Sequence, residues 1–593
     1  MSAPALIAAA FVALHLLAAH LPMSAVWGVH FLAYYPLWVQ VAVAAVAVCL
    51  MAPSPHGRRV LVRIAEILDA ACSRQMGRGV RGLSRGILAS VGTAAFLLLR
   101  SASHLLGDGY LYLHELPRET IRVDHSPLSF WLVKALFEVG SVASLDPEDA
   151  YRLYSYLAGL AYLLAVVPIV RTVAAGRRGR AIAAAILLTP GYLQLFCGYV
   201  EIYAMAYAGV ALYILVGLRV LKGTLPWWVA AGVAGLLLPL HFILLSLVPS
   251  LLFLVAAAPA GSGRAARSEE NRPAASALAP RPSRVLRGIA SLAIAAALLL
   301  LILLAIGVDP RIYTTSQASG GNLLPFWSPP ADNQAYHLFA PRHLLDFLNQ
   351  QLLAAPAAVL VLLLMRRTCW SARPDRLFLG LAAVAPLAAT FAVNPEIGAF
   401  RDWDLMAFPA VPLTVWAALA LAGEVEDRRL PGSAAWLICA ASGLHTLLWI
   451  GLNASAGASQ ARFEELLGAG QLSAHARSYG WETATRYSRE QGEPMLELDA
   501  SERAVEASPA NARHWYNAGQ ARYRLGGRRG AIDYWQRAVQ VRPDFVDAFD
   551  RLASTHYELG EAEQADRYLR QILALNPDPD HATRIREWLE GEK

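Results

Sequence analysis

Long apolar segments recur along most of the chain and constrain its fold more than any other feature. An α-helix needs about 20 apolar residues to cross a bilayer, and about thirteen segments approach that length. They lie near residues 3–21, 29–51, 86–106, 150–171, 180–197, 201–221, 226–240, 242–257, 286–306, 352–367, 377–393, 405–422 and 434–453. Only 16% of the 593 residues are charged, against about 25% in soluble domains. We predict an all-α, polytopic membrane protein.

Three other segments and the cysteines need separate interpretation. Residues 128–142 are apolar but interrupted by Lys134 and Glu138, which indicates a helix lying on the membrane surface. The first segment has no basic residues before it and a second follows at once, so we expect a helix of the mature protein and not a signal peptide. Residues 258–283, rich in Pro, Ala, Arg and Ser, are expected to form a flexible linker.

The five scattered cysteines lack metal-ligand spacing and suggest no disulfide framework.

Basic residues gather in alternate loops, and this sets the expected orientation. The basic groups lie at 58–85, 171–180, 219–222, 264–287, 366–376 and 428–429. The positive-inside rule assigns these loops and the N-terminus to the cytoplasm. The C-terminus is then expected outside, as are the loops at 107–149, 194–201, 307–351 and 394–404. This topology explains the net charge of +6 without a nucleic-acid partner.

After about residue 473 the charge rises and a 34-residue period appears. Its two clear periods contain Trp515, Gly519, Tyr523, Ala531, Trp535, Ala538 and Pro543, and then Phe549, Ala553, Tyr557, Ala565, Leu569, Ile572 and Pro577. A weaker earlier period keeps Trp481, Ala504 and Pro509. Large residues of one helix can fill the gaps beside small ones on the next, as in tetratricopeptide repeats. We predict a helical solenoid over residues 473–593, either a partner-binding surface or a structural module.

Asp108 is the first candidate for catalysis. It follows the third apolar segment directly, and Gly107 and Gly109 leave room for a ligand near the backbone. Ionisable groups at a membrane face cost desolvation energy, so they usually have a use. A carboxylate here could serve as a general base toward an acceptor hydroxyl or could bind a divalent metal. An Asp between two glycines is also a common turn.

His125 is the next candidate, because Pro127 suits the first turn of a following helix. A histidine at such a helix start could donate to a phosphate, or it could be a capping or solvated side chain.

The order of these motifs resembles the GT-C superfamily of polyprenyl-phosphate-dependent glycosyltransferases, which includes protein O-mannosyltransferases and lipid A aminoarabinose transferases. The resemblance rests on the apolar helix, the Asp-bearing loop, the segment His125–Leu132 and the acidic-aromatic segment Glu148–Leu153. It implies that Asp108 is the catalytic acid position and His125 a donor-phosphate contact. Many members have two adjacent acids where this chain has Asp108 and Gly109. Glu115 is a candidate substitute, and the metal requirement stays open.

Two further segments resemble the lumenal O-mannosyltransferases that carry C-terminal tetratricopeptide repeats. Gly198–Tyr203 is similar to their A/G-E-x-Y motif, and Pro239–Phe242 to their histidine between two short spans. The resemblance implies that Glu201, Tyr203 and His241 shape the sugar or acceptor pocket. Taken by themselves, the two residues have simpler explanations. Glu201 could be a helix N-terminal acid favoured by the helix dipole, and His241 could be a histidine at the membrane interface.

Arg401 lies in the last long outer turn, beside Asp402 and Asp404. A lone arginine between two apolar segments suits a lipid-linked phosphate, although it could equally pair with either acid. The loop Tyr313–Tyr336 is long for a plain connection and could close over a substrate.

These observations divide the chain into three expected parts: two spans and a basic loop (1–85), a GT-C-like catalytic domain (86–454) and an outer repeat domain (473–593). The expected enzyme is an inverting glycosyltransferase of a bacterial inner membrane. Its substrates would be a polyprenyl-phosphate sugar and a protein or glycan acceptor. One alternative is an O-antigen ligase or polymerase that uses a pyrophosphate-linked glycan, and another is a non-catalytic scaffold that presents the repeats. A transporter is disfavoured, because no two matching halves with interrupted helices are found.

Overall fold

A computed structural model describes the chain except for residues 1–2, 52–62, 64–65, 68, 70–77, 119–124, 142–143, 260–281, 312–322, 329, 365–372, 470, 576–577 and 592–593. The chain separates into two compact units, which are described in turn. The first contains residues 1–330, 336–395 and 399–462, and the second contains 331–335, 396–398 and 463–593. The described secondary structure is helical apart from one isolated bridge between Leu323 and Val393, which confirms the all-α prediction.

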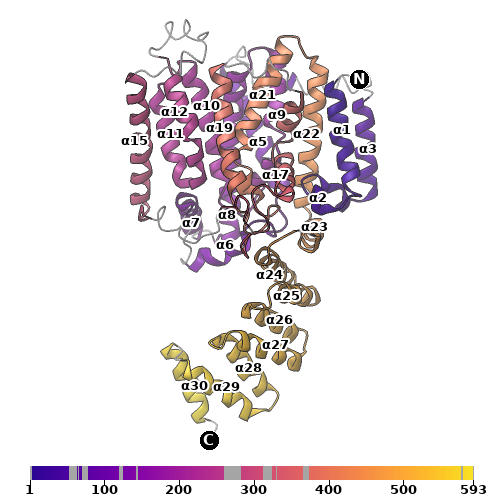
Figure 1. Cartoon of the computed structure of the whole chain (residues 1–593), viewed down its shortest axis with the longest axis vertical. Helices are drawn as coiled ribbons and strands as arrows, with labels where there is room; N and C mark the ends of the chain where they lie inside the picture. The colour runs from indigo at the N-terminus through magenta and orange to yellow at the C-terminus, as the bar shows by residue number, and fades with distance from the viewer. Residues whose placement is uncertain are drawn as a thin grey trace. The chain divides into compact units, whose positions relative to one another are not determined.

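The first unit is a bundle of apolar helices (Figure 1). Its helices are α1 (Ala3–Ala18), α2 (Met23–Val26), η1 (His30–Tyr34), α3 (Leu37–Met51), α5 (Arg78–Leu98), α6 (Gly109–Glu115), η2 (Leu116–Arg118), α7 (Pro127–Ser141), α8 (Pro147–Val173), α9 (Arg177–Leu187), η3 (Gly191–Phe196), α10 (Ala204–Leu221), α11 (Trp227–Leu237), η4 (Leu238–Leu240), η5 (Phe242–Leu247), α12 (Val248–Ala257), α15 (Pro282–Ala305), α17 (Pro341–Ala354), α18 (Pro356–Leu364), α19 (Pro374–Ala392), α20 (Trp403–Met406), α21 (Ala410–Glu426), α22 (Gly432–Asn453) and α23 (Ala456–Ala469), of which only the first turns of α23 belong to this unit.

Five described helices are long and apolar enough to cross a membrane: α8, α10, α15, α19 and α22. Each coincides with a segment predicted from the sequence. The bent pair α17 and α18 would make a sixth, and five shorter apolar helices of 10–17 residues lie elsewhere. The chain is therefore a helical membrane protein, whereas the expected total of about thirteen spans stays a prediction.

Helix α10 runs through the core of the bundle, in contact with α8, α11, α12, α19 and α21. Its buried side chains include Tyr207 and Tyr213. The pair α1 and α3 lies at one edge of the bundle and α15 at the other (Figure 1). The short helices α6 and α7 lie at one end of the bundle, where the chain also enters α10. This end therefore gathers loops that are far apart in sequence.

Two sequence expectations on helix boundaries are wrong. The third apolar segment was expected to continue to residue 106, but α5 ends at Leu98. Residues 307–351 were expected to be a loop, but α17 begins at Pro341 and meets α18 at a bend of 105°. Pro356 has no N–H to continue α17 and is suited to start a new helix, which accounts for the break.

The linker expected at 258–283 falls almost entirely outside the described residues, and the long loop Tyr313–Tyr336 is described only at 323–328 and 330–336. Helix α7, by contrast, covers the segment predicted as a surface helix and begins at Pro127, as the sequence indicated.

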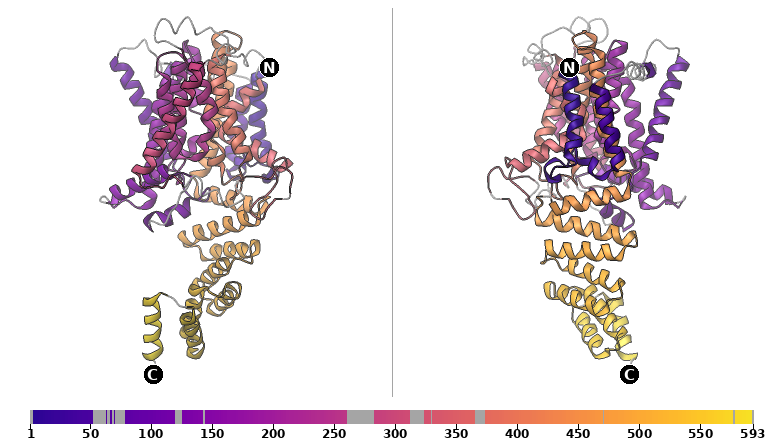
Figure 2. Two further views of the ribbon diagram at one scale, coloured as in Figure 1. Left: turned by 60° about the vertical axis from the view of Figure 1, so that its left-hand side comes forward. Right: turned by 90° about the vertical axis from the view of Figure 1, so that its right-hand side faces the viewer.

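The second unit is built from successive antiparallel helix pairs (Figure 2). After the rest of α23 they are α24 (Ala474–Glu490), α25 (Pro494–Ala507), α26 (Ala512–Arg524), α27 (Arg528–Val541), α28 (Val546–Glu558) and α29 (Ala562–Ala574), with α30 (Pro579–Gly591) at the end. The indole of Trp535 is fully buried, and a Cβ at Gly519 would lie 2.3 Å from its Nε1. Large-to-small packing between neighbouring helices is thus confirmed.

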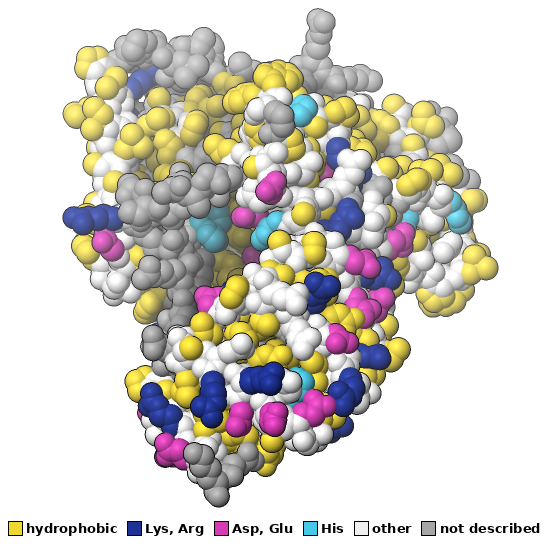
Figure 3. All heavy atoms as spheres, turned by 60° about the horizontal axis from the view of Figure 1, so that its bottom comes forward, with side chains coloured by type: hydrophobic (Ala, Val, Ile, Leu, Met, Phe, Trp, Pro, Cys, Tyr) yellow, Lys and Arg dark blue, Asp and Glu magenta, His cyan; other side chains and the backbone are white. Residues whose placement is uncertain are grey.

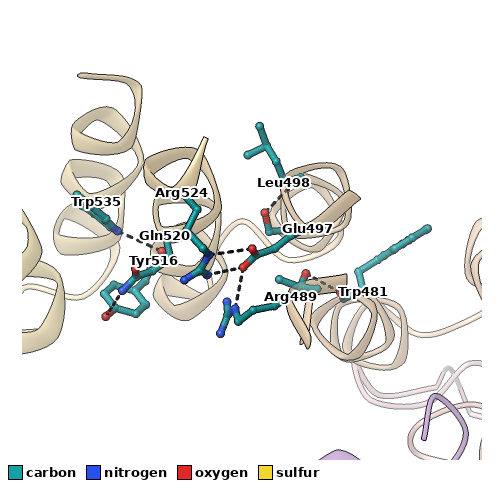
Figure 4. Close-up of polar contacts among 10 residues, drawn as sticks. Trp481, Arg489, Glu497, Leu498, Tyr516, Gln520, Arg524 and Trp535 are labelled. Atoms are coloured by element: carbon teal, nitrogen blue, oxygen red, sulfur yellow. Dashed lines mark hydrogen bonds and ion pairs between the residues drawn. The ribbon is translucent and has the colours of Figure 1, made fainter. Parts of the chain in front are cut away.

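A buried carboxylate ties the first three repeat helices together (Figure 4). The side chain of Glu497 on α25 is 1% exposed and accepts from Arg489 Nε of α24 at 2.8 Å. It also accepts from Arg524 of α26 at 2.9 Å and 2.5 Å. On the face shown in Figure 3, acidic and basic side chains are interspersed.

Candidate functional site

The segment between α5 and α6 carries Asp108 and is fixed by bonds to distant parts of the bundle. The N–H of Ser101 donates to the carbonyl of Cys197 at 2.8 Å, and the N–H of Ala102 donates to that of Asn453 at 2.9 Å. Asp108 then occupies the N-cap position of α6, with its side chain half-buried. Residues 99–107 are thus a structured loop, and Asp108 does not follow a membrane helix directly.

Glu201 lies against this loop. Its carboxylate is 2% exposed, and its Oε1 accepts from the backbone N–H of Asp108 at 2.6 Å. Gly107 has φ +65°, and a Cβ there would lie 2.2 Å from the same oxygen. Only glycine adopts this conformation readily and leaves the space, so Gly107 permits the contact. Glu201 precedes α10 by three residues, and its role is not limited to the helix dipole.

Arg401 holds the loop from the other side. Its guanidinium is fully buried, and Nη2 donates to the carbonyl of Gly107 at 2.7 Å. Asp404 on α20 is 1% exposed; its Oδ1 accepts from the N–H of Leu405 at 3.0 Å, and its Oδ2 has no hydrogen-bond partner among the described residues. We call Asp108, Glu201, Asp404 and Arg401 the acidic cluster.

Burial and mutual repulsion change the titration of this cluster. Burial, followed by the charges of Asp404 and Asp108, raises the pKa of Glu201 well above its usual range. Burial raises the pKa of Asp404 to about 7, with the charge of Asp108 acting in the same direction and the N–H of Leu405 against it. The raised pKa values favour the neutral forms of Glu201 and Asp404, so the cluster carries less negative charge than its three carboxyls suggest.

Aromatic side chains enclose the acidic cluster. The hydroxyl of Tyr199 accepts from Trp403 Nε1 at 3.1 Å, and both rings are buried. Burial raises the pKa of Tyr199 well above its usual range, and the charges of Asp404 and Glu201 add to this shift. The walls around the carboxyls therefore stay neutral and exclude water.

A second group, around His241, adjoins the cluster through Tyr203. The ring centroids of Tyr203 and His241 are 5.3 Å apart, and those of His125 and His241 are 5.1 Å apart. The carbonyl of His125 accepts from the N–H of Phe242 at 2.8 Å. His241 is 2% exposed, its Nδ1 accepts from the N–H of Ile243, and its Nε2 has no hydrogen-bond partner among the described residues. The structure thus brings His125, Tyr203 and His241 together.

The remaining candidates lie at the margin of the cluster. Glu115 ends α6, almost two turns beyond Asp108, and its charge acts on Tyr151. Asp402 is the half-buried N-cap residue of α20, and its charge acts on Tyr203. No group of three His, Cys, Asp or Glu side chains suited to hold a metal ion occurs among the described residues.

Sequence reasoning did not single out Tyr199 or Trp403. Both directly neighbour residues that it did name, since Tyr199 lies in the segment Gly198–Tyr203 and Trp403 follows Asp402. Trp403 lies between Asp402 and Asp404, and Tyr199 lies two residues before Glu201, so an aromatic residue close to an acid in two predicted outer turns was the available signal.

Comparison with known proteins gives one family and several similar structures. The tetratricopeptide repeat family model matches residues 547–579, which confirms the repeat prediction there. No curated protein matches the chain in sequence. The first tetratricopeptide domain of Spaghetti (RPAP3), bound to an HSP90 peptide, is similar with 19% identity over 19% of this chain and 94% of its own, at a TM-score of 0.18.

Two membrane enzymes are similar to a larger part of the chain. ArnT from Cupriavidus metallidurans, bound to undecaprenyl phosphate, has 13% identity, covers 81% of each chain and gives a TM-score of 0.37. The oligosaccharyltransferase AglB from Archaeoglobus fulgidus, in complex with an inhibitory peptide and a dolichol-phosphate, has 14% identity over 63% of this chain and 56% of its own, at a TM-score of 0.34.

Proposed function

We propose that the chain is an inverting membrane glycosyltransferase that moves a sugar from a polyprenyl phosphate to a hydroxyl of a protein or glycan acceptor. The observation that carries the proposal is the convergence of segments 107–108, 199–203 and 401–404. Glu201 binds the N–H of Asp108, and Arg401 binds the carbonyl of Gly107. All three segments were chosen from the sequence for sugar-transfer chemistry, and two of them hold the loop that carries Asp108.

In the proposed reaction the acceptor hydroxyl attacks the anomeric carbon while Asp108 takes its proton. The new glycosidic C–O bond forms as the anomeric C–O bond to phosphate breaks, and the polyprenyl phosphate leaves with the bonding electrons. A single displacement of this kind inverts the anomeric centre. Asp108 is suited to the base role because it is the half-buried carboxyl of the cluster, whereas Glu201 and Asp404 are almost fully buried.

Positive charge near the leaving group would stabilise the transition state. His125 is half-buried beside His241 and is proposed as the phosphate contact. The sequence also made Arg401 a candidate for the phosphate contact. Its guanidinium is buried against Gly107, so we assign it first to positioning the Asp108 loop. Tyr203, His241, Asp402 and Glu115 would border the sugar or acceptor pocket.

We place the reaction at the outer face of a bacterial inner membrane, with the repeat unit recruiting the acceptor from the same side. The positive-inside distribution supports this orientation. The repeats support the acceptor role because such arrays offer extended concave surfaces for partners.

The test is transfer from a labelled polyprenyl-phosphate sugar by membranes that contain Asp108→Asn. We expect transfer to fall by at least about a hundredfold, the usual contribution of a general base. Asp309→Asn, at an exposed aspartate outside the cluster, should leave transfer unchanged. Undiminished transfer by a well-expressed Asp108→Asn protein would remove Asp108 from the mechanism.

The same assay separates the alternatives. Transfer only from a pyrophosphate-linked oligosaccharide would indicate a ligase or polymerase. Full biological function with alanine at Asp108, Glu201 and Arg401 together would indicate a scaffold. Removal of divalent ions with EDTA, followed by addition of Mg²⁺ or Mn²⁺, tests the metal requirement that the sequence left open, through loss and recovery of transfer.

A further inference from the structure

A polar cavity lies at the opposite end of the bundle from the acidic cluster. Helix α10 begins at Ala204, beside Glu201, and runs for 18 residues to Leu221, which corresponds to about 27 Å. Lys222, the next residue, lines a cavity of about 430 Å³. A volume of this size is within the range of small-ligand sites. The cavity is therefore separate from the proposed catalytic site.

Six helices form the walls of this cavity, which we call the basic cavity. They are the C-terminal ends of α8, α10, α12 and α21 and the N-terminal turns of α15 and α19. Figure 1 shows α10, α12, α15 and α19 running alongside one another, and contacts connect α12 with each of the other three. Four of the six helices are long and apolar enough to cross a membrane. The ends of such helices lie where lipid headgroups lie.

The basic cavity carries an excess of positive charge. Its cations are Arg171, Lys222, Arg284, Arg287, Arg373 and Arg376, and its acids are Asp375, Glu426 and Asp427. Each acid already accepts a bond: Asp375 from Arg373 at 2.8 Å, Glu426 from the N–H of Gly176 at 2.6 Å, and Asp427 from Arg429 at 3.0 Å. Six cations against three acids leave a net charge of +3. A recess of one sign with apolar walls concentrates ions of the opposite sign.

The helix dipoles explain only part of this charge. Lys222 donates to the carbonyl of Thr172 at 2.6 Å, as expected for a cation near a helix C-terminus. Arg284 and Arg287, however, lie in the first two turns of α15, where the partial positive charge of the helix end opposes cations. Their convergence on the cavity thus has an electrostatic cost that an anion would offset.

We propose that the basic cavity binds a phosphate-bearing anion, either the headgroup of an anionic phospholipid or free phosphate. Basic pockets between membrane helices are the usual sites for such headgroups. The positive-inside prediction puts this end of the bundle at the cytoplasmic face, the opposite side from the proposed sugar transfer.

The test is a titration of the purified full-length chain in neutral detergent, followed through its unfolding temperature. The probes are short-chain phosphatidylglycerol, phosphatidylcholine with the same acyl chains, and sodium phosphate. We expect phosphatidylglycerol to raise the unfolding temperature and phosphatidylcholine not to do so, because a ligand of the folded state stabilises it. Arg284→Gln with Arg287→Gln should weaken the apparent affinity by roughly tenfold. The matched control is Arg178→Gln with Arg219→Gln, two exposed arginines outside the cavity lining, and it should retain the affinity.

A response to inorganic phosphate with the same dependence on these variants would identify the phosphate group as sufficient, and a response to phosphatidylglycerol alone would identify the lipid. The inference is overturned if neither probe stabilises the native chain, or if cavity and control variants respond equally. Arg284→Gln alone, at a half-buried side chain, replaces the double variant if the latter does not fold. The measurement involves no sugar transfer, so its outcome is independent of the proposed function.

Discussion

The backbone N–H of Asp108 donates to Oε1 of Glu201 over 2.6 Å, across 93 residues of sequence. The bond joins the start of α6 to the segment before α10. Because Arg401 binds the preceding carbonyl, that of Gly107, the loop is held on two sides. Four consequences of the structure and one of the predicted topology can be tested by experiment.

Gly107→Ala should displace the Glu201 carboxylate. The new Cβ would lie 2.2 Å from Oε1 at a backbone φ of +65°, so clash and backbone strain act together. We expect a loss of about 1–3 kcal/mol of stability and at least a tenfold loss of transfer. Gly307→Ala is the matched control, since φ there is +73° and no atom lies within 4 Å of the new Cβ. Equal thermal unfolding and equal transfer in the two variants would contradict the clash.

Glu201→Gln and Glu201→Ala should differ in stability. Burial raises the pKa of Glu201 and so favours its neutral form, which glutamine imitates while it can still accept from the N–H of Asp108. Alanine leaves that donor without its partner, which costs about 1–3 kcal/mol. Thermal unfolding at pH 7 measures both. An unfolding temperature for the glutamine variant as low as that for the alanine variant would show that the charged form of Glu201 is the native one.

The stability of the membrane unit should fall as the pH rises from about 4 to about 7. The pKa of Asp404 is raised from 3.8 to about 7 in the folded chain, so the folded state holds a proton that the unfolded state has lost in this range. The contribution of Asp404 to the free energy of unfolding is fully present below pH 3.8 and is lost as the pH rises through 7. Asp404→Asn removes the titration and should flatten the slope of unfolding temperature against pH. An unchanged slope, equal to that of Asp309→Asn, would contradict the shift.

Glu497→Gln should destabilise the start of the repeat unit. The carboxylate is 1% exposed and joins Arg489 to Arg524, and charge-assisted bonds of this kind contribute about 1.5–3 kcal/mol each to stability. Asp499→Asn is the control, because the Asp499 side chain is 57% exposed and its pair with Arg503 contributes little. Hydrogen exchange over residues 474–524 is the measurement. Equal protection in both variants would show that Glu497 does not hold these helices together.

Sidedness should follow the positive-inside prediction. Single cysteines at the exposed positions Ser141, Thr224 and Ser554 can be probed in intact cells with an impermeant maleimide. We expect labelling at 141 and 554 but not at 224, since only the first two belong to predicted outer segments. Labelling of 141 and 554 from different sides of the membrane would refute the proposed acceptor role of the repeats.

The general architecture could be predicted from the sequence, because apolar length and the 34-residue period are local properties. Trp535 and Gly519 show this, since their packing follows directly from the repeat. The end of α5 could not be predicted in this way. The predicted apolar segment ran on to residue 106, but the N–H groups of Ser101 and Ala102 bond to the carbonyls of Cys197 and Asn453 instead of continuing the helix. Hydropathy carries no information on such distant partners.

The candidate site was predicted in part. The resemblance selected Asp108 and Glu201, the place of Arg401 between two apolar segments selected that arginine, and these three residues converge. That Arg401 binds the carbonyl of Gly107 depends on how the two turns meet in space, which the sequence does not show. The bend of 105° between α17 and α18 could likewise not be predicted in full. Pro356 indicates that a helix breaks there, but it does not give the angle of the break.

The contact of Gly519 with the indole of Trp535 restricts how the repeat can vary. A side chain at 519 would enter the volume that the indole occupies, and a smaller residue at 535 would leave that volume empty. Neither position can change alone without loss of stability. Variant chains that still fold should therefore exchange the two residues jointly, with a bulkier group at 519 matched by a smaller one at 535.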